Sequence, residues 1–363
     1  MRMLFLTDRL SVRGGADQHL LQVMGAAREA GLQVTLGCGR VETSPPPGVK
    51  VVAVRGLGSA VAAPARLGRL GALLDSADVV HVQNVMNPVA LERAGATGRA
   101  VVTVQDHRVF CPGPGRTLPD GSPCAVTMAD EPCRACLPDD CYRRRQLELT
   151  TARREALRGA RLVVLSAYMA GELAAAALPG AVVVPPWIEP GLPRSEAGQG
   201  FVLGGRLVAH KAPLDAWQAW REAGEPQTLI IAGEGPLAPR LVGARHLGWL
   251  AGDRLRATLR RARALLFPAR WQEPFGILGV EALAEGAPVV VATSGGVSDW
   301  AAVGCLPVPA GDVAAMAGAV RRLAADPHLA LRLGEEGRMW VGERFARSRL
   351  EPRLHAIWQA AAG

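Results

Sequence analysis

The sequence predicts an α/β protein with two doubly wound domains, each a parallel sheet covered by helices on both faces. Apolar runs of strand length alternate with helix-length stretches along the whole chain, the pattern of parallel strands joined by helical crossovers. Several runs are continuously apolar, such as Leu162–Leu165 and Ala264–Phe267, because strands buried on both faces need no polar side. The pattern stops once, at Pro185–Gly191, and then restarts.

The elements before this break form the first predicted domain, residues 1–185. We expect helices at Ala16–Ala30 and Leu147–Arg158. The predicted strands are Met3–Thr7, Gln33–Gly37, Val51–Val54, Val79–Val82, Ala100–Val104, Leu162–Leu165 and Ala181–Val184.

The proline-rich segment Pro185–Gly191 is interpreted as a linker, because proline at this density cannot continue a helix or a central strand. The second predicted domain covers residues 186–348, and a last helix, Arg349–Ala362, lies in residues 349–363. The predicted strands of the second domain are Phe201–Leu203, Thr228–Ala232, His246–Gly248, Ala264–Phe267, Pro288–Ala292 and Leu306–Val308.

Length and composition agree with two large cores. The chain has 363 residues, of which 49% are hydrophobic, which is enough for two domains. No stretch approaches the roughly 20 apolar residues of a membrane span, and no secretory signal pattern is present. We therefore expect a cytoplasmic protein.

The formal net charge of +8 indicates an anionic partner. Nucleic acid is not expected, because no binding motif is present and only 4% of residues are aromatic. An anionic donor molecule is the simplest explanation. The arginines at 143–145, 153, 154, 158 and 161 also allow peripheral contact with an anionic membrane, or form a solvated helix face.

Two carboxylates mark the segment that bears most of the chemistry. Glu273 and Glu281 flank a Phe-Gly turn at the expected start of an apolar helix. Free N–H groups at a helix N-terminus together with carboxylates suit a ligand that has both phosphates and hydroxyls. Taken alone, the pair could also be surface charges on an amphipathic helix.

Cations follow the first strand of the second domain. Gly204 and Gly205 allow the backbone to approach a ligand closely, and Arg206 and Lys211 offer a planar fork and a mobile point charge for phosphate oxygens. A glycine turn with two surface cations is the simpler alternative.

The stretch Trp271–Gly296, with its Glu-x7-Glu core and Gly295-Gly296 after the next strand, resembles the donor site of retaining family 4 glycosyltransferases of the GT-B fold. The resemblance implies two Rossmann-like domains facing a cleft, and a C-terminal helix that can cross back to the first domain. It also implies a donor that is UDP-sugar, GDP-sugar or another nucleotide-diphosphate sugar. It is specific across residues 201–300 and looser in residues 1–185.

The resemblance also implies roles for individual residues. Arg206 and Lys211 would stabilise the departing diphosphate, Glu273 would contact the donor sugar, and Glu281 would accept the ribose hydroxyls. The further donor contacts that it implies are Gly14, Gly15, Gly205, Gly248, Trp249, Leu250, Phe275, Gly276, Ile277 and Leu278.

The first domain departs from the family pattern at its expected catalytic end. Gln105 stands where many relatives have histidine, whereas Asp106 is matched. His107 replaces an aromatic residue and is a substitute candidate for the active-site histidine. Each of Asp106 and His107 could instead make a structural hydrogen bond. In the second domain, Ser298-Asp299 replaces the usual Pro-Glu.

Five cysteines lie between residues 111 and 141 in an insertion rich in Pro, Gly and Asp, which we expect to lack regular structure. A loop of this length needs a staple. Cys111, Cys124, Cys133 and Cys136 could hold a structural zinc, with Cys141 as an alternate ligand. Free thiols and disulfides remain alternatives.

These features favour a glycosyltransferase that acts with retention by front-side attack and needs no metal or cofactor for its chemistry. The acceptor would be a lipid-linked sugar, a glycan or a small molecule. The alternatives are a sugar epimerase or phosphorylase on the same architecture, and a nucleotide-sugar-binding scaffold without activity.

Overall fold

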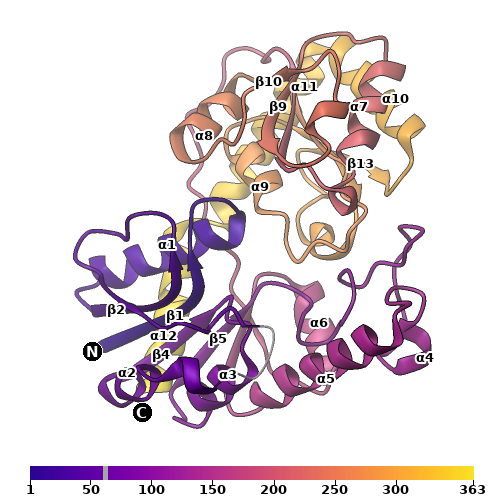
Figure 1. Ribbon diagram of the computed structural model, residues 1–363. Coiled ribbons are helices and arrows are strands. Elements are labelled where there is room, and N and C mark those ends of the chain that lie inside the picture. Colours follow the sequence, from indigo (N-terminus) through magenta and orange to yellow (C-terminus); the bar gives the residue numbers. More distant parts are fainter. Residues whose placement is uncertain (60–63) are drawn as a thin grey trace. The chain divides into compact units, whose positions relative to one another are not determined.

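The computed structural model describes residues 1–59 and 64–363 (Figure 1). The chain divides into two compact units. Unit 1 comprises residues 1–119, 124–185 and 351–363, and unit 2 comprises residues 120–123 and 186–350.

Unit 1 is built on a seven-stranded sheet in the order β3-β2-β1-β4-β5-β6-β7, with all neighbouring strands parallel. Its strands are β1 (Arg2–Leu10), β2 (Gln33–Val41), β3 (Lys50–Ala53), β4 (Val79–Gln83), β5 (Ala100–Val104), β6 (Arg161–Val164) and β7 (Val182–Val183). Its helices are α1 (Gly15–Glu29), η1 (Pro64–Leu67), α2 (Leu70–Ser76), α3 (Pro88–Gly95), α4 (Asp130–Cys133), α5 (Asp140–Ala156) and α6 (Ala167–Ala175).

Unit 2 has a six-stranded parallel sheet in the order β10-β9-β8-β11-β12-β13. Its strands are β8 (Phe201–Arg206), β9 (Leu229–Glu234), β10 (Arg245–His246), β11 (Ala264–Phe267), β12 (Val289–Thr293) and β13 (Cys305–Pro309). Its helices are η2 (Ala209–Lys211), α7 (Pro213–Glu222), η3 (Ala238–Arg240), α8 (Gly252–Arg261), α9 (Ile277–Ala284), η4 (Gly295–Asp299), α10 (Val313–Ala325), α11 (Pro327–Arg344) and the start of α12 (Arg347–Ala362).

Both sheets reverse their strand order beside the first strand of the unit, between β1 and β4 and between β8 and β11. In doubly wound sheets, loops diverge at this point, and ligands bind outside the carboxyl ends of the strands there. The predicted fold class of two doubly wound parallel-sheet domains is therefore confirmed, and the switch points locate the places to search for a site.

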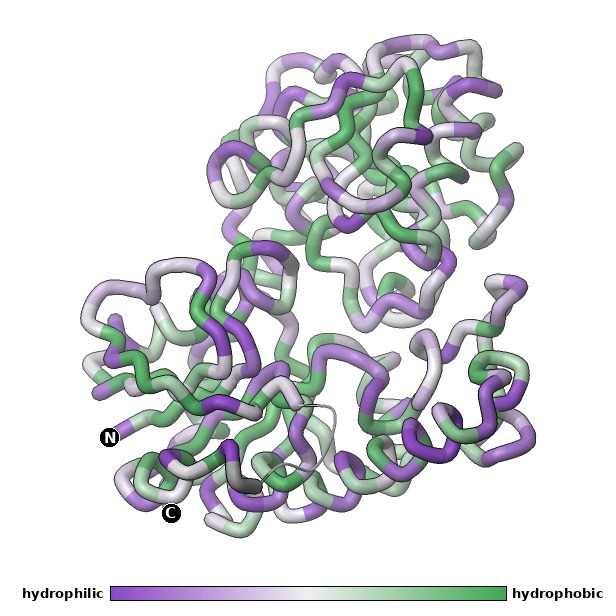
Figure 2. Tube along the Cα trace, in the orientation of Figure 1, coloured by the Kyte–Doolittle hydropathy of each residue, from purple (hydrophilic) through white to green (hydrophobic). Residues whose placement is uncertain are grey.

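Each unit has its own hydrophobic core. The runs read as strands are green in Figure 2 and are enclosed by more polar helices and loops. In unit 1, the core between sheet and helices includes Leu4, Val80 and Val102, and in unit 2 it includes Leu203 and Leu266, all at most 6% exposed. No helix among residues 1–59 and 64–363 is long and apolar enough to cross a membrane.

The last helix is anchored in unit 1 by a buried indole. Trp358 of α12 is fully buried and donates its indole N–H to Nδ1 of His81 at 2.9 Å, while Phe5 and His81 stack at a centroid distance of 5.0 Å. Burial lowers the pKa of His81 to about 3, so its ring is neutral and free to accept this bond.

The cysteine-rich insertion is more regular than expected. It contains α4, and α5 begins at Asp140 rather than at Leu147. Asp139 caps α5, since its carboxylate accepts from the Tyr142 amide at 2.6 Å. The expectation of an insertion without regular structure was therefore wrong, because the cap and the arginine described next order its second half.

Arg143 staples the insertion. Its side chain is 2% exposed, and its guanidinium donates to Asp130 at 2.9 Å, to Asp140 at 2.6 Å and to the Leu137 carbonyl at 2.9 Å. Arg153 is also buried. The interpretation of these arginines as a solvated helix face is thus wrong for Arg143 and Arg153. The Arg143 guanidinium is bound by residues of the insertion, and that of Arg153 faces the interior of unit 1.

Candidate functional site

The strongest convergence of predicted residues lies in unit 2, at the carboxyl end of β8. Arg206 ends this strand and is exposed, and its guanidinium makes no hydrogen bond or ion pair with any other described residue. Gly205 has a φ of 95°, which favours glycine. A Cβ on Gly204 would lie 2.8 Å from Leu278, so the strand end abuts the first turn of α9.

A lysine–carboxylate pair stands next to this strand end. Lys211, at the end of η2, forms an ion pair with Glu273, whose side chain is 5% exposed, and its ammonium lies 4.5 Å from the centre of the Trp271 ring. Burial lowers the pKa of Lys211, Glu273 works against that shift, and the charge of Arg206 adds to it. Because the pair is neutral as a whole, the charge of Arg206 is left to attract an anion.

The helix N-terminus opposite Arg206 is held by an aromatic wedge. Gly276 caps α9 with a φ of 85°, and the indole N–H of Trp300 donates to the Phe275 carbonyl at 2.6 Å. A Cβ on Gly279 would lie 2.1 Å from Trp300, so only glycine fits there. The Gly279 amide donates to the Gly276 carbonyl at 2.9 Å, so the amides of Ile277 and Leu278 are the first-turn N–H groups that suit an anion.

The Gly295-Gly296 segment is hydrogen-bonded to the loop that carries Glu273. The Gly296 amide donates to the Glu273 carbonyl at 2.6 Å, and the Gly295 amide donates to the Gln272 side chain at 3.0 Å. The Ser294 hydroxyl donates to the Trp271 carbonyl at 2.8 Å. The double glycine thus supports the Glu273 backbone, a role that the sequence motif alone did not reveal.

Glu281 lies about one turn into α9 in a partly buried position. Burial raises the pKa of Glu281 to about 7, with Arg256 opposing the shift and Glu285 adding to it. Arg256 is paired with Glu285 at 2.6 Å. Neither Arg256 nor Glu285 was singled out in the sequence, since the helices that bring them together are adjacent only in the fold.

The segment Gly248–Leu250 follows β10 and is fixed by the end of β9. The Trp249 amide donates to Glu234 at 3.3 Å, and Leu250 is 6% exposed. Glu234 is a further residue that sequence reasoning missed, because nothing in its local pattern indicates this partner.

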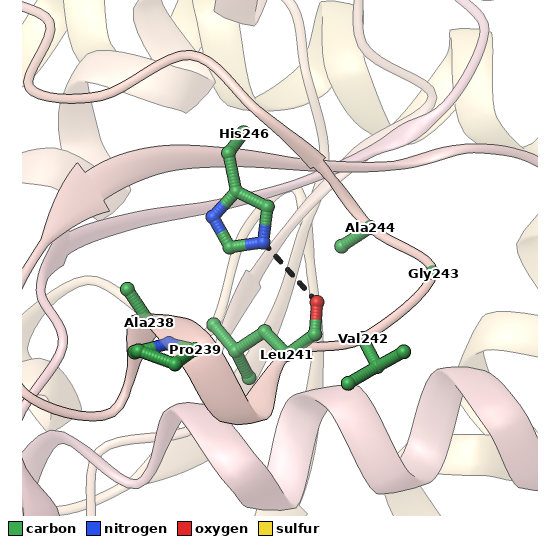
Figure 3. Close-up of a pocket in the computed structure, with 7 residues that line it drawn as sticks. All are labelled: Ala238, Pro239, Leu241, Val242, Gly243, Ala244 and His246. Carbon is green, nitrogen blue, oxygen red and sulfur yellow. Dashed lines mark hydrogen bonds between the residues drawn. The ribbon is translucent and has the colours of Figure 1, made fainter.

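An open pocket beside β10 lacks the cationic side chains that would bind a phosphate (Figure 3). It is lined by Ala238, Pro239, Leu241, Val242, Gly243, Ala244 and His246. The His246 ring is hydrogen-bonded to the Leu241 carbonyl at 3.2 Å, and no Lys or Arg lines the pocket.

In unit 1, the loop after β1 leads into α1 through the predicted glycine pair. Gly14 is the N-cap in an extended conformation, and α1 starts at Gly15. Asp17 in the first turn accepts from Arg9 at 2.9 Å, although burial still raises the pKa of Asp17. The Gln83 amide donates to the Ala16 carbonyl at 2.7 Å and ties this turn to the end of β4.

Gln105 belongs to a buried chain of amides. The Gln83 side chain donates to the Gln105 oxygen at 2.9 Å, and the Gln105 nitrogen lies 2.7 Å from Nδ1 of His19. Burial lowers the pKa of His19 to about 4, so its neutral ring accepts the Gln105 amide. The residue at the usual histidine position is thus a partner of another histidine.

Asp106 and His107 follow β5 and point to different partners. Asp106 forms an ion pair with Arg108 and accepts from the Arg108 amide at 2.9 Å. Burial works to raise the pKa of Asp106, but the charge and hydrogen bonds of Arg108 outweigh it and lower that pKa. His107 is 2% exposed and bonds to the Tyr168 hydroxyl at 3.1 Å. The structure therefore favours the structural role for His107.

The predicted zinc ligands lie in one another's neighbourhood. The thiols of Cys111 and Cys124 help to raise the pKa values of Cys133 and Cys136, after burial as the main cause. All cysteines are free, and residues 1–59 and 64–363 contain no group of three or more His, Cys, Asp or Glu side chains able to hold a metal. The zinc expectation gains no support, and Arg143 serves as the staple.

Sequence comparisons agree with the geometry of unit 2. Residues 199–326 match the family model described as Glycosyl transferases group 1. A glycogen synthase of Mycobacterium tuberculosis is 35% identical over 159 residues, 39% of this chain and 37% of the relative. A 2-deoxystreptamine glucosyltransferase of Streptomyces kanamyceticus is 31% identical over 173 residues, 43% of each chain. These matches span less than half the length of either curated relative.

Structure comparisons extend over the whole chain. A crystal structure of Anabaena HepE in complex with UDP-glucose matches with a TM-score of 0.70 at 15% identity, covering 99% of this chain and 100% of that chain. WaaG, a glycosyltransferase involved in lipopolysaccharide biosynthesis, matches with a TM-score of 0.73 at 15% identity, covering 98% and 99%. At this identity the likeness establishes the GT-B fold.

Proposed function

We propose that the protein is a retaining glycosyltransferase that transfers a sugar from a nucleotide-diphosphate sugar to an acceptor hydroxyl. One observation in unit 2 carries the proposal. The exposed Arg206, the Lys211–Glu273 pair and the N-terminus of α9 converge beside the switch point between β8 and β11. The match of residues 199–326 to the group 1 family and the UDP-glucose complex of HepE support it.

The donor would lie along α9. Arg206, Lys211 and the first-turn amides of α9 would bind the diphosphate, because guanidinium forks, ammonium groups and helix N-termini all favour phosphate oxygens. Glu273 would accept from a hydroxyl of the sugar, and Glu281 from the ribose. The backbone of Gly248–Leu250 would receive the base.

In the proposed reaction, the bond between the anomeric carbon and the diphosphate oxygen breaks. The acceptor oxygen bonds to the same face of that carbon, and its proton passes to the departing phosphate. The charge that develops on the diphosphate is stabilised by Arg206 and Lys211, whose preorganised positions require no rearrangement during the step. On this account, the chain supplies charge and positioning, with Asp106 on the acceptor side.

Isothermal titration calorimetry with UDP, GDP, ADP and TDP tests the donor site. We expect one of the four to bind, and Arg206→Ala to weaken that binding about tenfold or more, as for a lost charge-assisted contact to phosphate. Arg332→Ala is the matched control, because Arg332 is exposed on α11 and its guanidinium pairs with Glu336 of the same helix. Equal affinity of the two variants would remove Arg206 from the site.

Transfer itself requires a separate assay. The nucleotide that binds identifies which sugar conjugates to supply, and proton NMR of the product then reports the anomeric configuration. A product with the donor's configuration supports retention. Inversion, or binding without hydrolysis or transfer, would contradict the proposed activity.

A further inference from the structure

A pocket inside unit 1 opens at the carboxyl ends of β4 and β5. Its polar lining comes from Asn84, Thr103, Gln105, Asp106, Arg108 and Arg153, set among apolar side chains of the same unit. It therefore combines a shielded interior with several hydrogen-bonding groups.

Arg153 is a buried cation without a carboxylate of its own. It lies in the last turn of α5, is 4% exposed, and its Nε donates to the Met86 carbonyl at 2.9 Å. Among the residues that the structure describes, neither terminal nitrogen of its guanidinium has a hydrogen-bond acceptor, and no carboxylate lies within ion-pair distance. A buried charge is costly unless it is paired, so this guanidinium is suited to an anion from outside the chain.

The neighbouring charges leave the pocket short of negative charge. Arg108 is already paired with Asp106, and Asp8 also acts on Arg108. Burial and then the charge of Arg108 lower the pKa of Arg153, and Asp106 only partly offsets them. Asp106 is thus paired with Arg108, and its charge acts on Arg153 only from beyond ion-pair distance.

The loop after β4 contains the backbone carbonyl that Arg153 binds. Asn84 follows β4 with a φ of 58°, a left-handed conformation that is uncommon for residues other than glycine and best tolerated by asparagine and aspartate. This turn leads directly to the Met86 carbonyl that Arg153 binds. The Asn84 amide makes no hydrogen bond to another described residue and lines the pocket. Strained backbone of this kind gathers at binding sites.

We propose that this pocket binds an anionic group, a carboxylate or a phosphate ester, carried by the acceptor. The two terminal nitrogens of Arg153 form a planar fork that matches the paired oxygens of either group, and the Asn84 amide adds a donor. Asp106 holds Arg108 at the rim. The inference rests on the proposed function, because it assigns unit 1 to the acceptor, and it predicts selection against neutral acceptors.

Inorganic phosphate is the probe, titrated into protein saturated with the nucleotide that binds unit 2, so that the donor site is already filled. The variants are Arg153→Gln and, as matched control, Arg145→Gln, because Arg145 is exposed on the same helix. We expect phosphate binding in wild type and Arg145→Gln, and a loss of about tenfold or more in Arg153→Gln. Arg153→Lys, which keeps the charge without the fork, should be intermediate.

Nucleotide affinity separates this inference from the proposed function. Arg153→Gln should bind the nucleotide with the affinity of wild type, and this binding also shows that the variant is folded. If Arg153→Gln does not fold, Arg153→Lys takes its place in the comparison. No phosphate binding to wild type, or equal binding in the Arg153 and Arg145 variants, would overturn the pocket assignment. If no nucleotide binds, the donor proposal fails, yet the comparison of Arg153 with Arg145 still decides the pocket.

Discussion

At the scale of single residues, the candidate donor site depends on charges held in unusual surroundings. Lys211 is partly buried between Glu273 and the Trp271 ring, and Glu281 has a pKa of about 7. Perturbed groups gathered at the edge of a parallel sheet are typical of functional sites. Two predictions follow from these residues.

Removing the Lys211 ammonium should destabilise the protein through its partner. In Lys211→Met, the nearly buried Glu273 carboxylate loses its ion pair, at an expected cost of about 1–3 kcal/mol. The double variant with Glu273→Gln should recover most of this loss, because no unpaired charge then remains. Urea unfolding of the three proteins measures the effect. A double variant no more stable than Lys211→Met would show that the pair is not the cause.

Glu281 should make donor binding pH-dependent. Its carboxyl is protonated below about pH 7 and ionised above it, and only the carboxylate accepts fully from two ribose hydroxyls. Affinity for the intact nucleotide sugar should therefore rise as the pH increases through about 7. The sugar conjugate is used because the terminal phosphate of a free nucleotide titrates near pH ~6.

Glu281→Gln is the control for this profile, since its amide does not titrate. We expect weaker binding that is flat across the same pH range, with the fold intact. A wild-type profile as flat as that of the variant would place the ribose elsewhere.

At the scale of elements, the position of α9 is set by its contact with Trp300. The indole fills the space beside Gly279 and holds the Phe275 carbonyl, so the helix, its glycine cap and the Glu273 loop move together. A side chain at Gly279 must therefore disturb the candidate site as well as the packing.

Gly279→Ala should be destabilised by about 1–3 kcal/mol, the usual cost of overpacking a filled core, and should bind the nucleotide more weakly. Gly318→Ala is the matched control, because Gly318 is inside α10 and a Cβ there meets nothing within 4 Å. That variant should be neutral or slightly more stable. Thermal unfolding measures the stability and calorimetry measures nucleotide binding. Equal stability of the two variants would show that Trp300 does not restrict the residue at position 279.

At the scale of the whole molecule, histidines that are neutral in the folded chain connect the stability of both units to pH. Burial lowers the pKa of His81 to about 3 and that of His19 to about 4, both in unit 1. In unit 2, burial with the charges of Lys211 and Arg206 lowers the pKa of His210 to about 4. Below the ordinary histidine pKa of about 6.5, the unfolded chain takes up protons that the folded chain resists, so stability falls as the pH falls.

His19→Gln should make this decline shallower, because Gln keeps an acceptor for Gln105 and cannot be protonated. Between neutral pH and about two units lower, the variant should lose about 2 kcal/mol less than wild type. The difference between the two proteins is the test, since the raised pKa of Glu281 acts in the opposite direction in both. If the free energy of unfolding, measured with urea, falls equally with pH in both proteins, His19 is not a source of the pH dependence.

Both parallel sheets could be predicted from the amino-acid sequence, and the residues proposed for the donor site were selected from a sequence motif. The strands Ala100–Val104 and Ala264–Phe267 were predicted to the residue, because strands buried on both faces are formed largely by apolar side chains. Boundaries were less accurate where a cap decides them, as at Asp139, whose bond to the Tyr142 amide starts α5 early.

The pairing of charges, in contrast, could not be predicted before the chain was folded. Local pattern does not reveal that Arg143 closes the insertion, that His107 bonds to Tyr168, or that Arg153 is buried beside Met86. These partners come from separate elements, and burial removes the water that would otherwise screen and solvate each charge. The sequence can therefore supply the residues of a site, whereas the environment that tunes them exists only after the chain has folded.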